Sequence, residues 1–320
     1  MLEVRNVGKT YSANGKEVKA LNKVNFNIDT GEIVCLLGHK GAVKTTLVKS
    51  LASLLIPDEG EIWHNGKSIY DDLSEYRRIT SYLLGGERGL YNRLSGRDNI
   101  EYLAGLKGVF GKNLHRTIEA YFEELDMSKF IDQRVENYSR GMKQKVHLIN
   151  ALITNSEVLL LDEPTAGMDP VASKKTREFI KKIAQESNRK IIVTSHMMKE
   201  VEDLSDRILI INQGQLIFDD SIEYFKKKNR KITKCTCAIA NDSISESIVE
   251  ALESKYSTKL IKKNQGDKVE LSLTGKNAKE IVTSYIDPLK EVLLELSFYE
   301  SDLEDIYIEY IEQLAQNEIK

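Results

Sequence analysis

The chain of 320 residues has few cysteines, no long apolar run and almost no net charge. Its three cysteines are Cys35, in an apolar stretch, and Cys235 and Cys237, which alternate along one predicted strand. A CxC pair can bind a metal ion, but no partner cluster accompanies this one. We therefore expect reduced thiols rather than a disulfide framework or a metal site.

No stretch approaches the roughly 20 apolar residues that a membrane-spanning helix needs. The N-terminus also lacks the charged and then apolar pattern of a secretory signal. A formal net charge of −3 leaves no basic footprint for nucleic acid. These absences predict a cytosolic protein that does not bind nucleic acid. Any pathway across a membrane is then expected to belong to another chain.

A phosphate-binding loop is the first motif present, and it reads GHKGAVKTT over residues 38–46. The apolar residues 33–37 precede it and a helical pattern follows over residues 44–55, so the context is strand, loop and helix. In such a loop, backbone N–H groups and the helix N-terminus bind phosphates. Lys44 is expected to reach the β- and γ-phosphates, and Thr45 to ligate Mg²⁺. The predicted nucleotide contacts here are Gly38, His39, Lys40, Gly41, Ala42, Val43, Lys44, Thr45 and Thr46.

Val43 stands where such loops commonly have a glycine. If that position requires a positive φ, a β-branched residue costs about 1–3 kcal/mol there. We therefore expect Val43 to strain or reshape the loop, and Lys40 to offset part of the loss as an added cation near the triphosphate. This expectation keeps open a nucleotide-dependent switch that dimerises without useful turnover.

A second motif begins with the apolar residues 158–161, which read as a buried strand of a parallel sheet. The strand ends in Asp162 and Glu163. Carboxylates at the C-terminal end of such a strand lie beside the phosphate loop. We expect Asp162 to hold the shell of Mg²⁺ and Glu163 to polarise a water molecule.

Between these motifs, residues 138–144 read YSRGMKQ and open an amphipathic helix. Ser139 is a natural N-cap, and Gly141 leaves backbone N–H groups exposed for an anion. The segment resembles the signature motif of ATP-binding cassette (ABC) proteins, although Arg140 replaces the first glycine of the commonest form. The resemblance implies that this surface faces the γ-phosphate of ATP held by a second copy, so that a homodimer sandwiches two nucleotides.

The resemblance covers roughly residues 1–220 and gives roles to further positions. It implies that Tyr11 stacks on adenine, that Asp169 belongs to a loop signalling across the dimer, and that His196 contacts the γ-phosphate. Where the family has a glutamine after the strand-like residues 79–84, this chain has Gly86. Glu87 is the nearest oxygen donor for a cation.

The predicted fold is an α/β ABC-type ATPase domain of the P-loop NTPase class over residues 1–225, with an antiparallel start at residues 1–30. A helical subdomain is expected over about 90–155. Its core positions follow the apolar spacing of Ile100, Leu103, Leu106, Ile118, Phe122 and Leu125. The resemblance implies that its groove with residues 85–97 receives a permease. The candidate contacts are Arg88, Arg93 and Arg97.

A second domain, regulatory or dimerising, is predicted over residues 226–320 after a basic linker. Its pattern of strands (231–240, 258–263, 268–273, 291–299) and helices (243–254, 276–286) resembles a ferredoxin-like βαββαβ unit. Ser301 and Glu304 form a capping box for a final helix. Such a C-terminal helix is similar to that of drug and antimicrobial-peptide exporter ATPases.

These features together predict the ATP-hydrolysing subunit of an ABC exporter, peripheral on the cytoplasmic face of the membrane and coupled to a separate permease. Glu163 is the expected general base, His196 orients the water, and Lys44 stabilises charge. A soluble ABC protein acting on ribosomes or DNA is the other alternative. Such proteins have tandem cassettes or a coiled-coil insert, and this sequence has neither. The signature motif excludes a phosphate-loop kinase, and no residue indicates the cargo.

Overall fold

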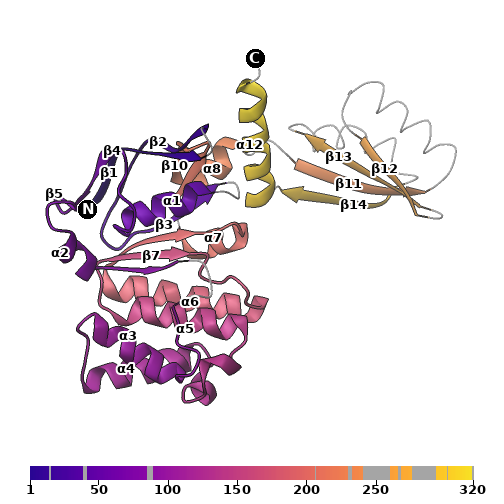
Figure 1. Ribbon diagram of the computed structural model, residues 1–320. Coiled ribbons are helices and arrows are strands. Elements are labelled where there is room, and N and C mark those ends of the chain that lie inside the picture. The colour runs from indigo at the N-terminus through magenta and orange to yellow at the C-terminus, as the bar shows by residue number, and fades with distance from the viewer. Residues whose placement is uncertain are drawn as a thin grey trace. The chain divides into compact units, whose positions relative to one another are not determined.

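The computed structural model describes residues 1–13, 16–38, 42–84, 89–205, 207–229, 233–240, 260–265, 268–275, 293–300 and 302–318. The chain divides into two compact units, Met1–Ile222 and Glu223–Lys320, which are called unit 1 and unit 2 (Figure 1). Over the described ranges, no helix is both long enough and apolar enough to cross a membrane.

A six-stranded sheet forms the centre of unit 1, in the order β10-β9-β3-β8-β7-β6. All neighbours are parallel except β10, which runs antiparallel to β9. Every residue of β7 and β8 is buried, as expected for parallel strands covered on both faces. The strands are β3 (Ile33–Gly38), β6 (Thr80–Leu83), β7 (Val158–Asp162), β8 (Lys190–Thr194), β9 (Arg207–Asn212) and β10 (Gln215–Ser221).

A second, antiparallel sheet has the order β2-β1-β4-β5. Its strands are β1 (Leu2–Ala13), β2 (Lys16–Ile28), β4 (Glu59–His64) and β5 (Lys67–Ser68), and α2 (Leu73–Arg78) follows it. β1 pairs with β2 from Leu2↔Ile28 to Ala13↔Lys16, which confirms the predicted antiparallel start.

Helix α1 (Ala42–Leu51) lies between the two sheets (Figure 1). Its residues Leu47, Val48 and Leu51 are fully buried in one core with apolar residues of β1, β2, β3 and β7. The helix ends four residues earlier than predicted. Ser53, two residues past its end, has a left-handed backbone with φ of 55°.

Helices α5 (Arg140–Ile153) and α6 (Pro170–Ser187) lie along the other face of the six-stranded sheet, and α3 (Gly96–Leu106) and α4 (Lys112–Glu124) lie beyond them (Figure 1). This part of unit 1 also contains α7 (Met198–Leu204) and the 3-10 turns η1 (Ser128–Phe130) and η2 (Val135–Asn137). The predicted core positions Ile100, Ile118, Phe122 and Leu125 are fully buried. The prediction is wrong for Leu106, which is 68% exposed in the last turn of α3.

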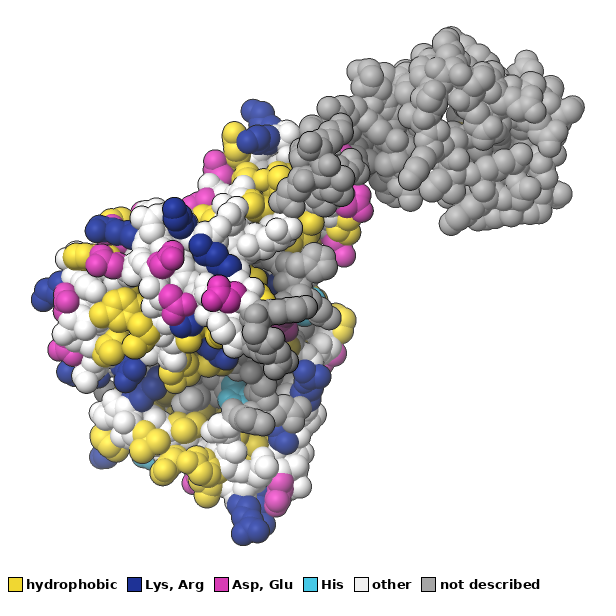
Figure 2. All heavy atoms as spheres, turned by 45° about the horizontal axis from the view of Figure 1, so that its top comes forward, with side chains coloured by type: hydrophobic (Ala, Val, Ile, Leu, Met, Phe, Trp, Pro, Cys, Tyr) yellow, Lys and Arg dark blue, Asp and Glu magenta, His cyan; other side chains and the backbone are white. Residues whose placement is uncertain are grey.

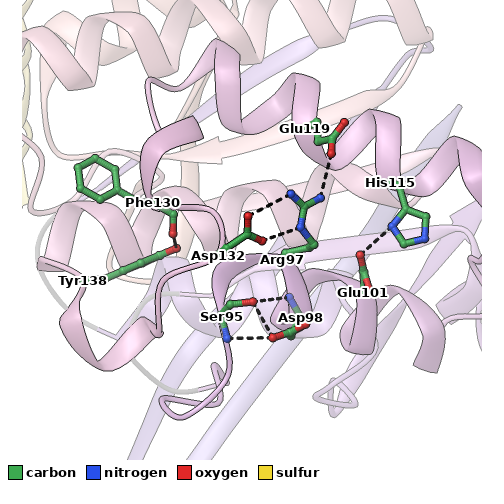
Figure 3. Close-up of polar contacts among 9 residues, drawn as sticks. All are labelled: Ser95, Arg97, Asp98, Glu101, His115, Glu119, Phe130, Asp132 and Tyr138. Atoms are coloured by element: carbon green, nitrogen blue, oxygen red, sulfur yellow. Dashed lines mark hydrogen bonds and ion pairs between the residues drawn. The ribbon is translucent and has the colours of Figure 1, made fainter.

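Polar contacts join α3 to its neighbours (Figure 3). Ser95 and Asp98 form a capping box at the start of α3. Arg97 donates to Asp132 over 2.7 Å and to Glu119 of α4 over 3.1 Å. The guanidinium of Arg97 is therefore engaged within the chain, and its contact with a permease stays a prediction.

Unit 2 contains a four-stranded antiparallel sheet in the order β12-β13-β11-β14. The strands are β11 (Thr233–Ala240), β12 (Leu260–Gln265), β13 (Lys268–Gly275) and β14 (Leu293–Glu300). Because β13 is antiparallel to both β11 and β12, these two run parallel with β13 between them, the arrangement of a split βαβ unit. The two predicted connecting helices, 243–254 and 276–286, lie outside the described residues.

Among the residues of unit 2 that the structure describes are two helices, α8 (Ile222–Asn229), which begins at the last residue of unit 1, and α12 (Leu303–Glu318). Leu303 and Ile306 of α12 are buried, and the ring of Tyr310 meets that of Phe225 of α8 at 5.3 Å. Asp302 caps α12 by accepting from the N–H of Asp305. The predicted final helix is thus present, and the predicted cap, Ser301, lies outside the described residues.

Candidate active site

Lys44 lies in the first turn of α1 and is only 6% exposed. Its ammonium group donates to the carbonyl of Gly38 at the end of β3. Burial lowers the pKa of Lys44, and the nearby carboxylates of Glu163 and Asp162 act in the opposite direction. The structure therefore brings the predicted lysine and the two predicted carboxylates into one site.

Val43 is a helical residue of α1 and does not have a left-handed backbone. Its side chain is partly buried and packs against the core between the two sheets. Of the two expectations, strain or a reshaped loop, strain is therefore wrong. The helix begins at Ala42, so position 43 needs only an ordinary right-handed conformation, which valine adopts at small cost.

Gly38 is required for a different reason, the close approach of a neighbouring strand. A Cβ atom at this position would lie 2.7 Å from the carbonyl oxygen of Ile211 in β9. Because that oxygen belongs to the backbone of a buried strand, it cannot move aside cheaply. The loop therefore leaves β3 at a position that only glycine fits.

Asp162 is buried at the carboxyl end of β7. Its Oδ1 accepts a hydrogen bond from the hydroxyl of Thr194, at the end of the adjacent strand β8. The same hydroxyl accepts from the backbone N–H of Glu163 at 3.2 Å. Thr194 thus orients both carboxylate-bearing residues from one position.

Glu163 has a left-handed backbone with φ of 49°, a conformation that costs a non-glycine residue about 1–3 kcal/mol. Its N–H also bonds to the carbonyl of Thr194 at 3.0 Å, and its carbonyl accepts from Nε2 of Gln144 at 3.0 Å. Its carboxylate Oε1 lies 3.1 Å from Nδ1 of His196. The predicted base and the predicted switch histidine are therefore in direct contact, with both side chains partly exposed to solvent.

The signature segment opens α5, as predicted. Ser139 is its N-cap and accepts from the N–H of Met142 at 3.2 Å. Gly141 packs closely on the loop after β7, since a Cβ there would lie 3.2 Å from the carbonyl of Gly167. Gly167 has φ of 76°, and a Cβ on it would lie 2.9 Å from Cδ of Arg140. Arg140 therefore covers the loop that leads to Asp169 of the same chain.

The structure also shows the surroundings of two further predicted residues, Tyr11 and Asp169. The hydroxyl of Tyr11 lies 3.5 Å from Oγ1 of Thr46, and the ring of Tyr11 is partly exposed beside the start of α1. Asp169 is the N-cap of α6 and accepts from the N–H groups of Val171 and Ala172, which lower its pKa. Other positions lie outside the described residues: His39, Lys40, Gly41, Gly85, Gly86, Glu87 and Arg88.

The site suits a magnesium ion that is bound mainly by its nucleotide. Among the residues that the structure describes, no three His, Cys, Asp or Glu side chains gather as a metal site. Asp162 and Thr45 offer one hard oxygen donor each, on β7 and α1. Because Mg²⁺ usually takes one or two protein ligands together with phosphates and water, this small donor set fits it.

Sequence reasoning missed the supporting contacts of Thr194, Gln144 and Glu200. Thr194 was not singled out from the sequence, and Gln144 was noted only as part of the signature motif. Glu200 is a carboxylate in the short helix α7 and is 2% exposed. No local signal marked it, because His196 precedes α7 and its partner Thr165 is 35 residues away in the sequence.

Comparison with known proteins agrees with this geometry. A family model described as "ABC transporter" matches residues 21–166. The ABC transporter ATP-binding protein NatA of Bacillus subtilis (strain 168) is 34% identical over 230 residues, which cover 72% of this chain and 93% of NatA. The chain belongs to the family of ABC transporter ATP-binding proteins. As a member, it is an ATP-binding and ATP-hydrolysing subunit.

A second relative of this ABC protein extends beyond unit 1. The bacitracin transport ATP-binding protein BcrA of Bacillus licheniformis is 31% identical over 298 residues, 92% of each chain, so the match includes part of unit 2. Among solved structures, an "ATP binding subunit of ABC transporter" superposes with a TM-score of 0.64 at 26% identity, covering 71% of this chain and 92% of the other. The predicted α/β P-loop fold is therefore confirmed.

Proposed function

We propose that this ABC ATPase drives export through a separate membrane permease, with two copies closing on two molecules of Mg-ATP. The single observation that carries the chemical part is the Glu163–His196 contact of 3.1 Å beside Lys44 and Asp162. A role in transport is supported by BcrA, a bacitracin transport ATP-binding protein that matches 92% of this chain, and the direction of transport is part of the proposal. The cargo belongs to the permease and is left open.

In this proposal Glu163 accepts the proton of the attacking water, which lies between its carboxylate and the γ-phosphate. His196 fixes the direction of that carboxylate and contacts the γ-phosphate. The rigid placement of Glu163 supports the role, because its backbone is held on both sides by Thr194 and Gln144. Positioning of this kind supplies a large share of the rate in phosphoryl transfer.

Lys44 leaves the carbonyl of Gly38 to stabilise charge on the β- and γ-phosphates. Thr45 and Asp162 are the residues that would hold magnesium, which when bound would neutralise charge on the phosphate oxygens. Thr194 keeps Asp162 in one orientation by donating to Oδ1. Tyr11 offers its partly exposed ring to adenine.

The second half of each site comes from the partner copy. Ser139 and Gly141 present the N-terminus of the 14-residue helix α5 at the surface of unit 1. A helix N-terminus attracts an anion, and this one carries the signature motif of the family. In the proposed dimer it faces the γ-phosphate held by the other chain, so neither copy forms a complete site alone.

We place the permease on an apolar surface of the α3–α4 region, made of Tyr91, Tyr102, Leu106 and Phe110. Leu106 is 68% and Phe110 is 73% exposed, and the rings of Tyr91 and Tyr102 meet edge to face at 5.1 Å. Charges of both signs mix with apolar side chains over the face of unit 1 in Figure 2. Because exposed apolar patches mark interaction sites, these four large exposed residues support binding of a protein partner here. Binding there would hold the subunit at the membrane.

Steady-state phosphate release tests the catalytic assignment. Glu163→Gln should lower kcat by at least about 100-fold, because it removes the general base while keeping the shape of the side chain. Its affinity for Mg-ATP, measured by equilibrium binding, should stay within about threefold of wild type. The control is Glu178→Gln, an exposed carboxylate of α6. A Glu163→Gln protein that hydrolyses ATP at the wild-type rate contradicts the proposal.

Co-purification from detergent-solubilised membranes tests the docking surface. Leu106→Asp should abolish recovery of an integral-membrane partner, because a charge replaces an exposed apolar contact. The matched control is Leu54→Asp, which places the same charge on an exposed leucine in the turn after α1. Equal recovery with both variants would remove the α3–α4 surface from consideration.

The alternative, a switch that dimerises without useful turnover, loses its main support with the helical conformation of Val43. One observation still supports it: Gly86 stands where the family has a glutamine. Measured turnover of the wild-type protein separates the two functions. Nucleotide-dependent dimerisation without phosphate release would favour the switch.

A further inference from the structure

The buried carboxylate of Glu200 has no role in the proposed chemistry, yet it lies directly behind it. Glu200 is in the first turn of α7 and is 2% exposed. Its Oε1 accepts from the hydroxyl of Thr165 at 2.8 Å, and its Oε2 accepts from the hydroxyl of Ser195. Each carboxylate oxygen therefore has its own hydroxyl donor.

The two donors come from different segments of the active site. Thr165 is two residues after Glu163, in the turn where the N–H of Ala166 bonds to the carbonyl of Glu163 at 3.1 Å. Ser195 immediately precedes His196, and its hydroxyl also accepts from the N–H of Met197 at 3.0 Å. The carboxylate thus ties the segment that carries the proposed base to the segment that carries the switch histidine.

We propose that Glu200 is a positioning residue that holds the loop after β7 and the His196 segment in register, so that Glu163 and His196 meet. The inference rests on the proposed roles of those two residues. The carboxylate of Glu200 is buried and bonds to the hydroxyl groups of Thr165 and Ser195. It acts through Thr165 on the turn after Glu163, and through Ser195 on the backbone on both sides of His196.

The cost of burying this carboxylate supports a positioning role. Burial raises the pKa of Glu200, while the bonds from Ser195 and Thr165 and the charges of Arg177 and His196 act in the opposite direction. Arg177 is itself buried and pairs with Asp203 at 3.0 Å. A leucine would fill the same volume without that penalty, but it could not accept two hydroxyl bonds from two segments.

The test compares paired variants in the full-length protein, by steady-state phosphate release and by thermal unfolding. Thr165→Ala removes one donor, and Thr165→Ser is its matched control because it keeps the hydroxyl. Glu200→Ala removes both bonds, whereas Glu200→Gln keeps the shape and still offers an oxygen. We expect kcat to fall about tenfold or more in both alanine variants, with KM for ATP within about twofold. Thr165→Ser and Glu200→Gln should stay within about threefold of wild type.

Two results overturn the inference. One is a wild-type kcat per folded molecule in both alanine variants together with a lower unfolding temperature, which assigns Glu200 a purely structural role. The other is a raised KM with an unchanged kcat, which assigns it to nucleotide binding. Glu163→Gln and His196→Ala are measured alongside. If neither of these lowers kcat, the proposed function fails. If both do while Glu200→Ala does not, only the positioning role fails.

Discussion

At the scale of single residues, Val43 shows how an altered motif position is accommodated. Its side chain packs against the core between the two sheets, close to Lys44 in the same turn of α1. The side chain therefore adds contacts that a glycine could not make. Backbone strain is found instead at Glu163, whose left-handed conformation is held by hydrogen bonds to Thr194 and Gln144.

Replacing Val43 with glycine should therefore weaken the protein rather than activate it. We expect Val43→Gly to lower the free energy of unfolding by roughly 1–2 kcal/mol, from lost packing and the low helix propensity of glycine. Val43→Ala, which keeps the helix propensity, should lose less. Urea denaturation gives the stability, and phosphate release the rate. A large gain in turnover for the glycine form would show that valine does impair the loop.

Site residues could be predicted from the sequence where the residue type has one main chemical use within its motif. Lys44, Asp162, Glu163 and His196 were predicted one by one, and they lie in one site in the structure. Thr194 and Glu200 were missed because their value depends on which strands and helices become neighbours. The error at Val43 came from assuming a loop conformation at a position where the helix had already begun.

At the scale of elements, the junction of the two sheets contains a buried histidine. His64 ends β4, is 8% exposed, and lies 3.4 Å from Glu157. Burial lowers the pKa of His64, Lys190 and the N-terminal amino group lower it further, and Glu157 partly offsets them. The folded chain therefore takes up a proton here at lower pH than the unfolded chain does.

This shift predicts acid sensitivity. With the folded pKa depressed, the unfolded state binds the proton first, so stability is fully present above about pH 6.5 and is lost as pH falls below it. His64→Gln should reduce the drop in urea midpoint between pH 7.5 and pH 5.5. His115→Gln is the control, because His115 is exposed and pairs with Glu101 at the surface of the helical region. An identical drop in wild type and His64→Gln would contradict this assignment.

Element boundaries were predicted less well than element types. The strands of unit 1 and the antiparallel start follow from alternation and apolar runs, which local sequence reveals. The exposure of Leu106 does not follow, because apolar spacing cannot distinguish a core position from an exposed one. The ion pairs of Arg97 in Figure 3 were invisible for a similar reason, since Asp132 is 35 residues away.

At the scale of the whole molecule, the proposed dimer makes each site from two chains. A two-fold symmetric pair places Lys44 of one copy opposite Ser139 of the other, twice. The contribution of Lys44 and the contribution of Ser139 can therefore be removed in separate chains. A mixture of such chains distinguishes a shared site from two independent ones.

Lys44→Ala and Ser139→Arg proteins should each be nearly inactive alone, but their equimolar mixture should regain activity. In a mixed dimer one site carries both defects and the other carries none. Random pairing therefore leaves about a quarter of all sites intact. Phosphate release from the mixture measures the recovery, and a double variant mixed with Lys44→Ala is the control that cannot recover. No recovery in dimers shown to be mixed would argue against the shared site.

The bond from Lys44 to the carbonyl of Gly38 has a consequence for affinity. The ammonium already has an acceptor before any ligand arrives, so an incoming triphosphate must compete for it. What the lysine contributes to binding is thus the difference between an anionic and a neutral acceptor. Ligands with less negative charge at the β- and γ-positions should gain little from this side chain, which favours triphosphates over uncharged analogues of the same shape.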